Sequence, residues 1–233
     1  MSRKKKSPFF RRMVFLGLKV LFVLWILTLI QVASLRFLNP PLTATMLWAR
    51  IQGENPRAHA WLTPSWRRLG RISPHLRKAV LAGEDQRFLS HHGFDFTEMN
   101  RAIRQLAMKK GIRGASTISM QVARTVFLWP ARTWLRKLAE AYYTFLIEIF
   151  WSKQRILEMY LNTVDWGNGI RGAQAASERY FHVPARDISP SQAALLAAVL
   201  PSPHRWSPVH PNTRVLRRQR RILRDMRKMP LVS

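Results

Sequence analysis

Apolar residues are concentrated in one uninterrupted stretch near the start of the chain. Between Met13 and Ala33 the only charged residue is Lys19. A helix of this length, at about 1.5 Å per residue, spans roughly 31 Å, close to the roughly 30 Å thickness of a bilayer's hydrocarbon core. The pattern therefore predicts a transmembrane helix over residues 13–33, preceded by a basic tail at residues 1–12.

The charges beside this segment predict its orientation. Six basic residues precede it: Arg3, Lys4, Lys5, Lys6, Arg11 and Arg12. Positive charge is retained on the cytoplasmic side, so the remainder of the chain is expected across the membrane. A cleaved signal peptide is the alternative, because Val32, Ala33 and Ser34 could form a cleavage site. Its apolar region would run only about 7 to 15 residues, and we favour an uncleaved anchor.

Beyond Asn39-Pro40-Pro41, the spacing of apolar positions predicts a mainly α fold. Residues 34–74 lack sustained periodicity and are expected to be an irregular membrane-proximal segment. A helix is then expected to begin at Ser73-Pro74, and Thr97 is expected to cap the next one. The remaining helices are expected at 116–128, 132–151, 153–163, 190–200 and 213–228, and no stretch alternates like a strand. Residues 75–212 would form the main domain, followed by a basic C-terminal helix at 213–233.

The segment from Arg132 to Trp151 is apolar on most faces after its first two turns. It could be a central core helix or a second membrane span. Glu140 and Glu148 interrupt it, and each would be costly in lipid. We therefore expect a central core helix.

The charge balance is strongly basic. Thirty-nine Lys and Arg against twelve Asp and Glu give a net charge of +27, which favours a polyanionic partner. When the six N-terminal cations, the eight between Arg214 and Lys228, and Asp225 are set aside, 25 basic and 11 acidic residues remain. A membrane-tethered domain outside the cytoplasm meets lipid phosphates rather than DNA, so no nucleic-acid partner is expected. The absence of Cys excludes disulfides, thiol nucleophiles and Cys-ligated metals.

Two neighbouring carboxylates are the first candidates for acid–base chemistry. Glu84 and Asp85 follow an apolar helix and lie near Phe88, an environment that can raise a carboxyl pKa by desolvation. A solvated helix end is the alternative reading. His91 and His92 could orient the acids or cap a turn, and nothing resembles HExxH, so no metal ligand set is predicted.

Two further segments carry groups that suit an anionic ligand. In GASTISMQVAR (114–124), backbone N–H groups at a helix start suit a phosphate, although an ordinary serine N-cap explains the same residues. Ser116, Thr117, Gln121 and Arg124 supply donors and charge there. Glu140 follows Arg132, Arg136 and Lys137 on one helical face, either as an ion-paired carboxylate or as the anchor of cations that meet a diphosphate.

Five ordered patterns together resemble one family. They are EDQRF (84–88) with His91, Gly93 and Asp95; GASTISMQ (114–121); Arg136-Lys137 to Glu140; KQRILEMYLN (153–162); and WGNGIRGAQAASERYF (166–181). Over residues 75–205 the chain resembles the peptidoglycan glycosyltransferases of family 51. It departs from that pattern at Ala115, Met120, Arg124 and Thr125.

The resemblance implies a lysozyme-like fold and the polymerisation of lipid II into glycan strands, with inversion and release of undecaprenyl diphosphate. It implies Glu84 and Glu140 as catalytic residues. It also implies a set of substrate-binding residues: Asp85, Phe88, His91, Ser116, Thr117, Gln121, Arg124, Arg132, Arg136 and Lys137. The implied partners are lipid II, the nascent glycan strand and other cell-wall synthase or division proteins.

The resemblance further implies a single-pass protein of a bacterial inner membrane with a periplasmic catalytic domain, and Mg²⁺ as a candidate cofactor without a visible ligand set. Two alternatives remain. A lysozyme-like or lytic muramidase would also keep a glutamate in an apolar pocket, but its leaving group is a sugar hydroxyl and needs no cation cluster. A non-catalytic membrane-bound scaffold could use the basic surface for binding alone.

Overall fold

The computed structural model describes residues 8–53, 65–108, 114, 116–131, 133–167 and 169–232, in two units that divide after Leu38. The first unit contains one long helix, α1 (Pro8–Leu35). Within the described residues, its Arg11–Leu35 segment is the one helix long and apolar enough to cross a membrane. The span predicted at 13–33 lies inside it, and α1 fits a single-pass membrane anchor.

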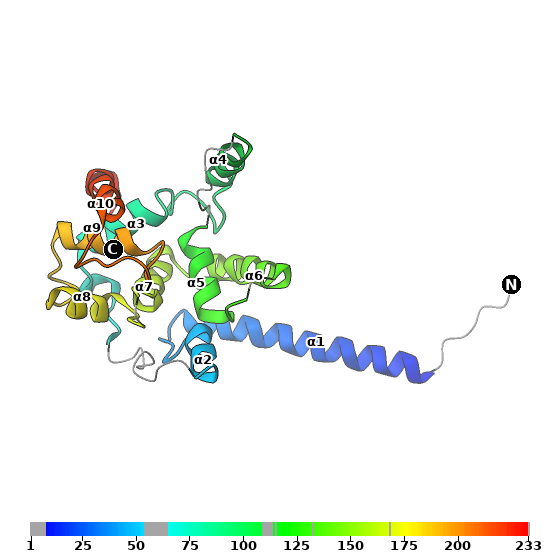
Figure 1. Cartoon of the computed structure of the whole chain (residues 1–233). Coiled ribbons are helices and arrows are strands. Elements are labelled where there is room, and N and C mark those ends of the chain that lie inside the picture. Colours follow the sequence, from blue (N-terminus) through cyan, green and yellow to red (C-terminus); the bar gives the residue numbers. More distant parts are fainter. Residues whose placement is uncertain are drawn as a thin grey trace. The chain divides into compact units, whose positions relative to one another are not determined.

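The second unit is built almost entirely from helices (Figure 1). They are α2 (Ala44–Ile51), α3 (Pro74–Glu84), α4 (Phe96–Ala107), α5 (Ile118–Phe127), α6 (Trp134–Phe150), α7 (Lys153–Thr163), α8 (Ala173–Phe181), α9 (Pro190–Val199) and α10 (Thr213–Asp225), with short 3₁₀ turns η3 (Leu69–Arg71) and η4 (Met226–Lys228). In the described parts of the chain, extended pairing is limited to one isolated bridge between Asp165 and Arg171. The mainly α prediction is confirmed.

Side-chain caps explain where most helices begin. The hydroxyls of Ser73, Ser152 and Ser189 each accept a backbone N–H in the first turn of α3, α7 and α9. The predicted cap of α4 at Thr97 is wrong, because the Asp95 carboxylate accepts from the Glu98 N–H and the helix begins at Phe96. Two helices, α2 and α8, were not expected; α8 follows Gly172 without any side-chain cap.

The helices of the second unit pack in two groups. In the first, α9 lies against both α3 and α10, as Figure 1 shows. The buried alanines of α9 permit close approach, and a Cβ added at Gly83 of α3 would lie 3.7 Å from the Ala197 Cβ. In the second group, α5 contacts α2, α6 and α7. The arginine-rich helix α10 is therefore an integral part of this unit.

Helix α6 is not the fully buried core helix that its composition predicts. Its buried residues are Glu140, Thr144, Leu146 and Ile147. A stripe of apolar side chains on another face is more than half exposed: Trp134, Leu135, Leu138, Phe145 and Ile149. The prediction of a central core helix is wrong because the apolar residues cover more of the helix than its neighbours α5 and the 91–93 loop can bury. An exposed apolar stripe of this length marks an interaction surface.

Two glycines shape the loop between α7 and α8. Gly172 has φ +85°, and a Cβ there would lie 2.9 Å from the carbonyl oxygen of Asn162. Gly167 has φ +100°, and a Cβ there would lie 2.2 Å from the carbonyl oxygen of Pro203. Both positions combine left-handed backbone with close backbone contact, which only glycine tolerates.

We expect Gly167→Ala to lower the free energy of unfolding by about 2 kcal/mol or more, because the added methyl group meets backbone and the φ value is strained. Thermal unfolding of the full chain in detergent measures this. Gly70→Ala is the matched control, since a Cβ at Gly70 meets nothing within 4 Å. Equal melting temperatures for the two variants would contradict the expectation.

Candidate active site

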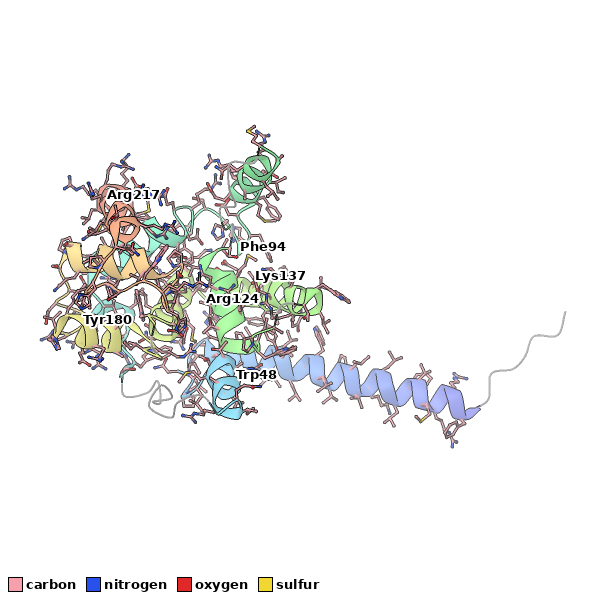
Figure 2. The ribbon with its side chains drawn as sticks, in the orientation of Figure 1. Trp48, Phe94, Arg124, Lys137, Tyr180 and Arg217 are labelled. Atoms are coloured by element: carbon pink, nitrogen blue, oxygen red, sulfur yellow. The ribbon has the colours of Figure 1, made fainter. Side chains whose placement is uncertain are left out.

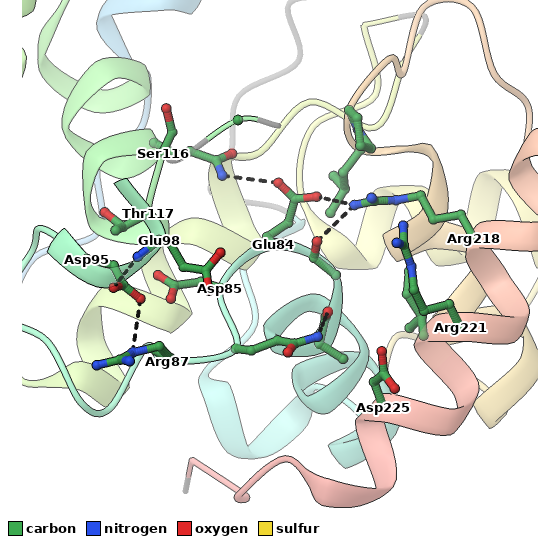
Figure 3. Close-up of a pocket in the computed structure, with 18 of the residues that line it drawn as sticks. Glu84, Asp85, Arg87, Asp95, Glu98, Ser116, Thr117, Arg218, Arg221 and Asp225 are labelled. Atoms are coloured by element: carbon green, nitrogen blue, oxygen red, sulfur yellow. Dashed lines mark hydrogen bonds and ion pairs between the residues drawn. The ribbon is translucent and has the colours of Figure 1, made fainter. Parts of the chain in front are cut away.

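A cavity of about 730 Å³ opens where α3 ends. Its walls come from residues 82–87, from Gly114 and parts of residues 116–124, from residues 200–201 directly after α9, and from α10, with further residues from the start of α4. Figure 3 shows Glu84 between Ser116 and Thr117 on one side and Arg218 and Arg221 on the other. The cavity thus joins parts of the sequence that lie far apart.

Glu84 is the last residue of α3, and its side chain is 13% exposed. One carboxylate oxygen, Oε1, accepts from Arg218 Nη2 at 2.9 Å, and the other, Oε2, accepts from Gln121 Nε2 at 3.2 Å. Arg218 Nη2 also donates to the Gly83 carbonyl at 2.9 Å. The carboxylate is therefore held from α5 on one side and from α10 on the other.

The pKa of Glu84 is raised above its ordinary value, chiefly because burial disfavours the charged form. Arg218 and the hydrogen bond from Gln121 act in the opposite direction, and the neighbouring Asp85 raises the pKa further. A carboxylate with a raised pKa is a stronger base at neutral pH than an ordinary surface glutamate. Glu84 is the candidate proton acceptor of the cavity.

Asp85 has a different role from its neighbour. Its buried carboxylate accepts from His91 Nε2 at 3.0 Å and from the Ile118 N–H at the start of α5, also at 3.0 Å. The hydroxyl of Thr117 donates to the Gly93 carbonyl and accepts from the Met120 N–H. Thr117 therefore caps α5, in place of the serine cap that the sequence suggested, and the Asp85 carboxylate accepts the first N–H of the helix.

Four of the predicted substrate-binding residues that the structure describes do not line the cavity, and two of these four are buried beneath it: Phe88 and His91. Phe88 is 1% exposed, and the Lys153 ammonium lies 4.6 Å from its ring centroid. His91 is also buried, and its main-chain carbonyl accepts from Lys153 Nζ at 2.7 Å. These residues support the loop that carries Asp85, so any effect they have on a ligand is indirect.

Other predicted residues do face the cavity. Ser116, Gln121 and Arg124 line it together with Glu84. Within the described part of the chain, neither Arg124 nor Arg221 makes an ion pair, whereas Arg87 and Arg101 are paired with Asp95 and Glu98. Positive charge without an internal counterion is available to an anionic ligand.

Glu140, Arg136 and Lys137 form a separate cluster on α6. The fully buried Glu140 carboxylate accepts from Arg136 Nη1 and from Lys137 Nζ, each at 2.6 Å. None of the three lines the cavity, but α6 packs against α5, and Figure 2 shows Lys137 on α6 and Arg124 on α5. Arg132, the remaining predicted cation, lies outside the described residues.

In the described parts of the chain, one group of side chains brings metal-ligating atoms close together: Asp85, His91 and Asp95, within 4.8 Å of one another. The two carboxylates and His91 Nε2 already have internal partners, and among the described residues His91 Nδ1 has no hydrogen-bond partner. Asp85 pairs with His91, and Asp95 caps α4 and pairs with Arg87 at 3.2 Å. We assign no metal ligand here, and the divalent cation suggested by the resemblance gains no ligand set.

Sequence reasoning missed Arg218, because the basic run at 213–228 was expected to form a C-terminal helix outside the main domain at 75–212. A signal for its packing was present. Val215, Gln219, Ile222 and Met226 recur at helical spacing and are all buried. Arg218 lies beside that buried face, 134 residues from Glu84 in the sequence.

The chain is similar to known proteins over most of its length. The sequence model of a family described as "Transglycosylase" matches residues 54–227. A biosynthetic peptidoglycan transglycosylase from Bacteroides thetaiotaomicron is 45% identical over 208 residues, which cover 87% of this chain and 82% of the relative. Proteins of the same name from Ectopseudomonas mendocina and Pseudomonas fluorescens are 45% and 44% identical, covering 91% and 94% of this chain and 88% and 90% of the relatives.

We expect Arg218→Gln to raise the pKa of Glu84, since the substitution removes a cation in contact with the carboxylate. An NMR titration of the protein labelled with ¹³C in the glutamate carboxyl groups measures the change. Arg217→Gln, an exposed position on the same helix (Figure 2), should leave the pKa as it is. An unchanged or lower pKa in Arg218→Gln would show that the ion pair does not control Glu84.

Proposed function

Because this chain belongs to the transglycosylase family and is a peptidoglycan glycosyltransferase, we propose that the cavity around Glu84 is the site where lipid II is polymerised into glycan strands. The observation that carries the proposal is a partly buried carboxylate with a raised pKa in the same cavity as Arg124, which makes no ion pair with any described residue. A base and a cation are the two groups that transfer of a sugar from a diphosphate requires.

Glu84 acts as the general base. Its carboxylate removes the proton from the 4-hydroxyl of the acceptor GlcNAc as that oxygen attacks C1 of the donor MurNAc. The new C1–O bond forms on the face opposite the leaving group, and the bond between C1 and the diphosphate oxygen breaks. Glu84 ends the step protonated, and undecaprenyl diphosphate leaves with the electron pair. The raised pKa of Glu84 favours this proton transfer near neutral pH.

Arg124 meets the negative charge that develops on the diphosphate. Arg136 and Lys137 lie on the helix packed against α5, and we assign them to add positive charge for the diphosphate, the role that the family resemblance also implies for Arg132. Glu140 has no exposed surface, so it does not touch the substrate. We assign it as a positioning residue that holds Arg136 and Lys137 in place. Fixed cations stabilise developing charge without the cost of reorganising at the moment of reaction.

The muramidase alternative is less consistent with these groups. A hydrolase of glycan strands expels a sugar hydroxyl, which does not call for an unpaired arginine beside the base. A non-catalytic scaffold, in turn, gives no reason for a carboxylate whose pKa is raised by burial inside a cavity.

The membrane anchor suits a substrate carried on a lipid. We assign the chain to a bacterial inner membrane, with the N-terminus in the cytoplasm and the catalytic unit in the periplasm, because basic residues precede α1. Tethering raises the effective concentration of enzyme relative to lipid II without new contacts. The exposed apolar stripe of α6 is suited to insertion at the boundary between lipid headgroups and acyl chains, where its apolar side chains would be removed from water.

We expect the purified full chain to convert lipid II into glycan polymer and Glu84→Gln to reduce the rate by at least about 100-fold, since the amide cannot accept the proton. Binding of lipid II should be largely retained. Glu178→Gln, at an exposed position outside the cavity, serves as control. Polymerisation at the native rate by Glu84→Gln would refute the base, and cleavage of preformed strands without polymer formation would favour the muramidase.

We expect Glu140→Gln to lower kcat about 10- to 100-fold, because loss of the charge releases Arg136 and Lys137 from their positions. Steady-state kinetics with lipid II test this, with thermal unfolding to detect any loss of fold. Asp187→Asn, which breaks the exposed ion pair with Arg186, is the control. A small change in kcat would reduce Glu140 to a structural ion partner.

A further inference from the structure

A tyrosine lies behind the site, where the proposed mechanism has no use for it. Tyr160 belongs to α7 and is 2% exposed. Its hydroxyl donates to Gln121 Oε1 at 3.3 Å, and the other end of that amide donates from Nε2 to Glu84 Oε2 at 3.2 Å. The three side chains form a continuous chain of hydrogen bonds from the core to the candidate base.

The direction of these hydrogen bonds matters because an amide can rotate by half a turn. With Nε2 toward Glu84, Gln121 donates to the carboxylate. In the flipped orientation it would present an oxygen, which disfavours the charged form of Glu84. Burial raises the pKa of Tyr160 well above its ordinary value, with Glu84 and Asp85 adding to the shift, so the phenol keeps its proton.

The phenol proton needs an acceptor inside the protein. Among the described residues, the Tyr160 hydroxyl has one hydrogen-bond partner, the Gln121 side-chain oxygen. A flipped amide would leave the buried hydroxyl proton without an acceptor, and a buried unsatisfied donor costs about 1–3 kcal/mol. Tyr160 therefore favours the amide orientation that serves Glu84.

Charged groups on several elements also surround Glu84. Arg218 of α10 holds its other oxygen, Asp85 follows it in the chain, and Arg124 of α5 lines the same cavity. Arg218 lowers the pKa of Glu84 and Asp85 raises it. Arg218 Nη2 donates to Oε1 and Gln121 Nε2 donates to Oε2, so the amide orients this second oxygen.

We propose that Tyr160 is a positioning residue for the glycosyl transfer: its hydroxyl fixes the Gln121 amide, and the amide holds the Glu84 carboxylate aimed into the cavity. The inference rests on the assignment of Glu84 as the general base. Without the hydroxyl the amide can rotate, Glu84 loses its donor for part of the time, and the charged carboxylate becomes both less stable and less well oriented.

The test is Tyr160→Phe, which removes one oxygen and keeps the ring. We expect kcat for lipid II polymerisation to fall about 10-fold while KM changes little, and the acid limb of the kcat–pH profile to move up by about one pH unit. The direction follows because a donor stabilises the charged carboxylate, so losing the donor raises the pKa. The size corresponds to one hydrogen bond to a charged group.

Tyr180→Phe is the matched control. It also removes a phenol that donates one hydrogen bond, to the Trp166 carbonyl at 3.0 Å, and Tyr180 does not line the cavity. Its pH profile should stay where it is. In a Gln121→Met background, Tyr160→Phe should have no further effect, because the pathway runs through that amide.

Two results would overturn the proposal. One is an unchanged acid limb in Tyr160→Phe, even if kcat and the melting temperature both fall, since a purely structural role predicts that pattern. The other is full additivity of Tyr160→Phe with Gln121→Met. An NMR titration of Glu84 separates this proposal from the proposed function: its pKa should rise in Tyr160→Phe whether or not Glu84→Gln abolishes polymerisation.

Discussion

The site depends on two opposing effects on the pKa of Glu84: desolvation raises it, and contacts with Arg218 and Gln121 lower it. Burial favours the neutral acid, while Arg218 and Gln121 favour the carboxylate. Either influence alone would be unsuitable for a base: a fully desolvated acid would keep its proton, and a fully paired carboxylate would hardly accept one. The two contacts come from α10 and α5, so the basicity of Glu84 depends on how these helices pack around the end of α3.

Asp85, the next residue in the chain, has a structural role instead. Adjacent acidic residues at the end of α3 have separate roles, because Glu84 borders the cavity and Asp85 binds His91 and the first N–H of α5. This contact fixes the start of α5 relative to the end of α3. It thereby sets the distance between Glu84 and Gln121, one turn further along α5. The candidate base, Glu84, and the residue that fixes α5 beside it, Asp85, are thus adjacent in the sequence.

The basic residues of the domain serve more than one purpose. Arg218 is bound to Glu84, Arg136 is bound to the buried Glu140, and Arg124 has no ion pair within the described residues. Arg218 orients the Glu84 carboxylate, Arg136 is itself held by Glu140, and Arg124 is available to a diphosphate. The large net charge of the chain therefore includes cations with different roles, some that position other side chains of the site and some that are available to bind the substrate.

The sequence by itself determined the elements that rest on local physics. The apolar run at 13–33 predicts α1, Ser-capped starts predict α3, α7 and α9, and five ordered motifs indicated the family and the candidate Glu84. Only the tertiary structure decided that α6 exposes an apolar stripe, that Arg218 reaches Glu84, and that Tyr160 supports Gln121. Helix capping and hydropathy depend on residues a few positions apart, so the elements that they determine can be predicted directly from the sequence. Burial and ion pairing depend on residues that are distant in the sequence and become neighbours only on folding. The contact between Arg218 and Glu84 therefore could not be read from the basic run at 213–228.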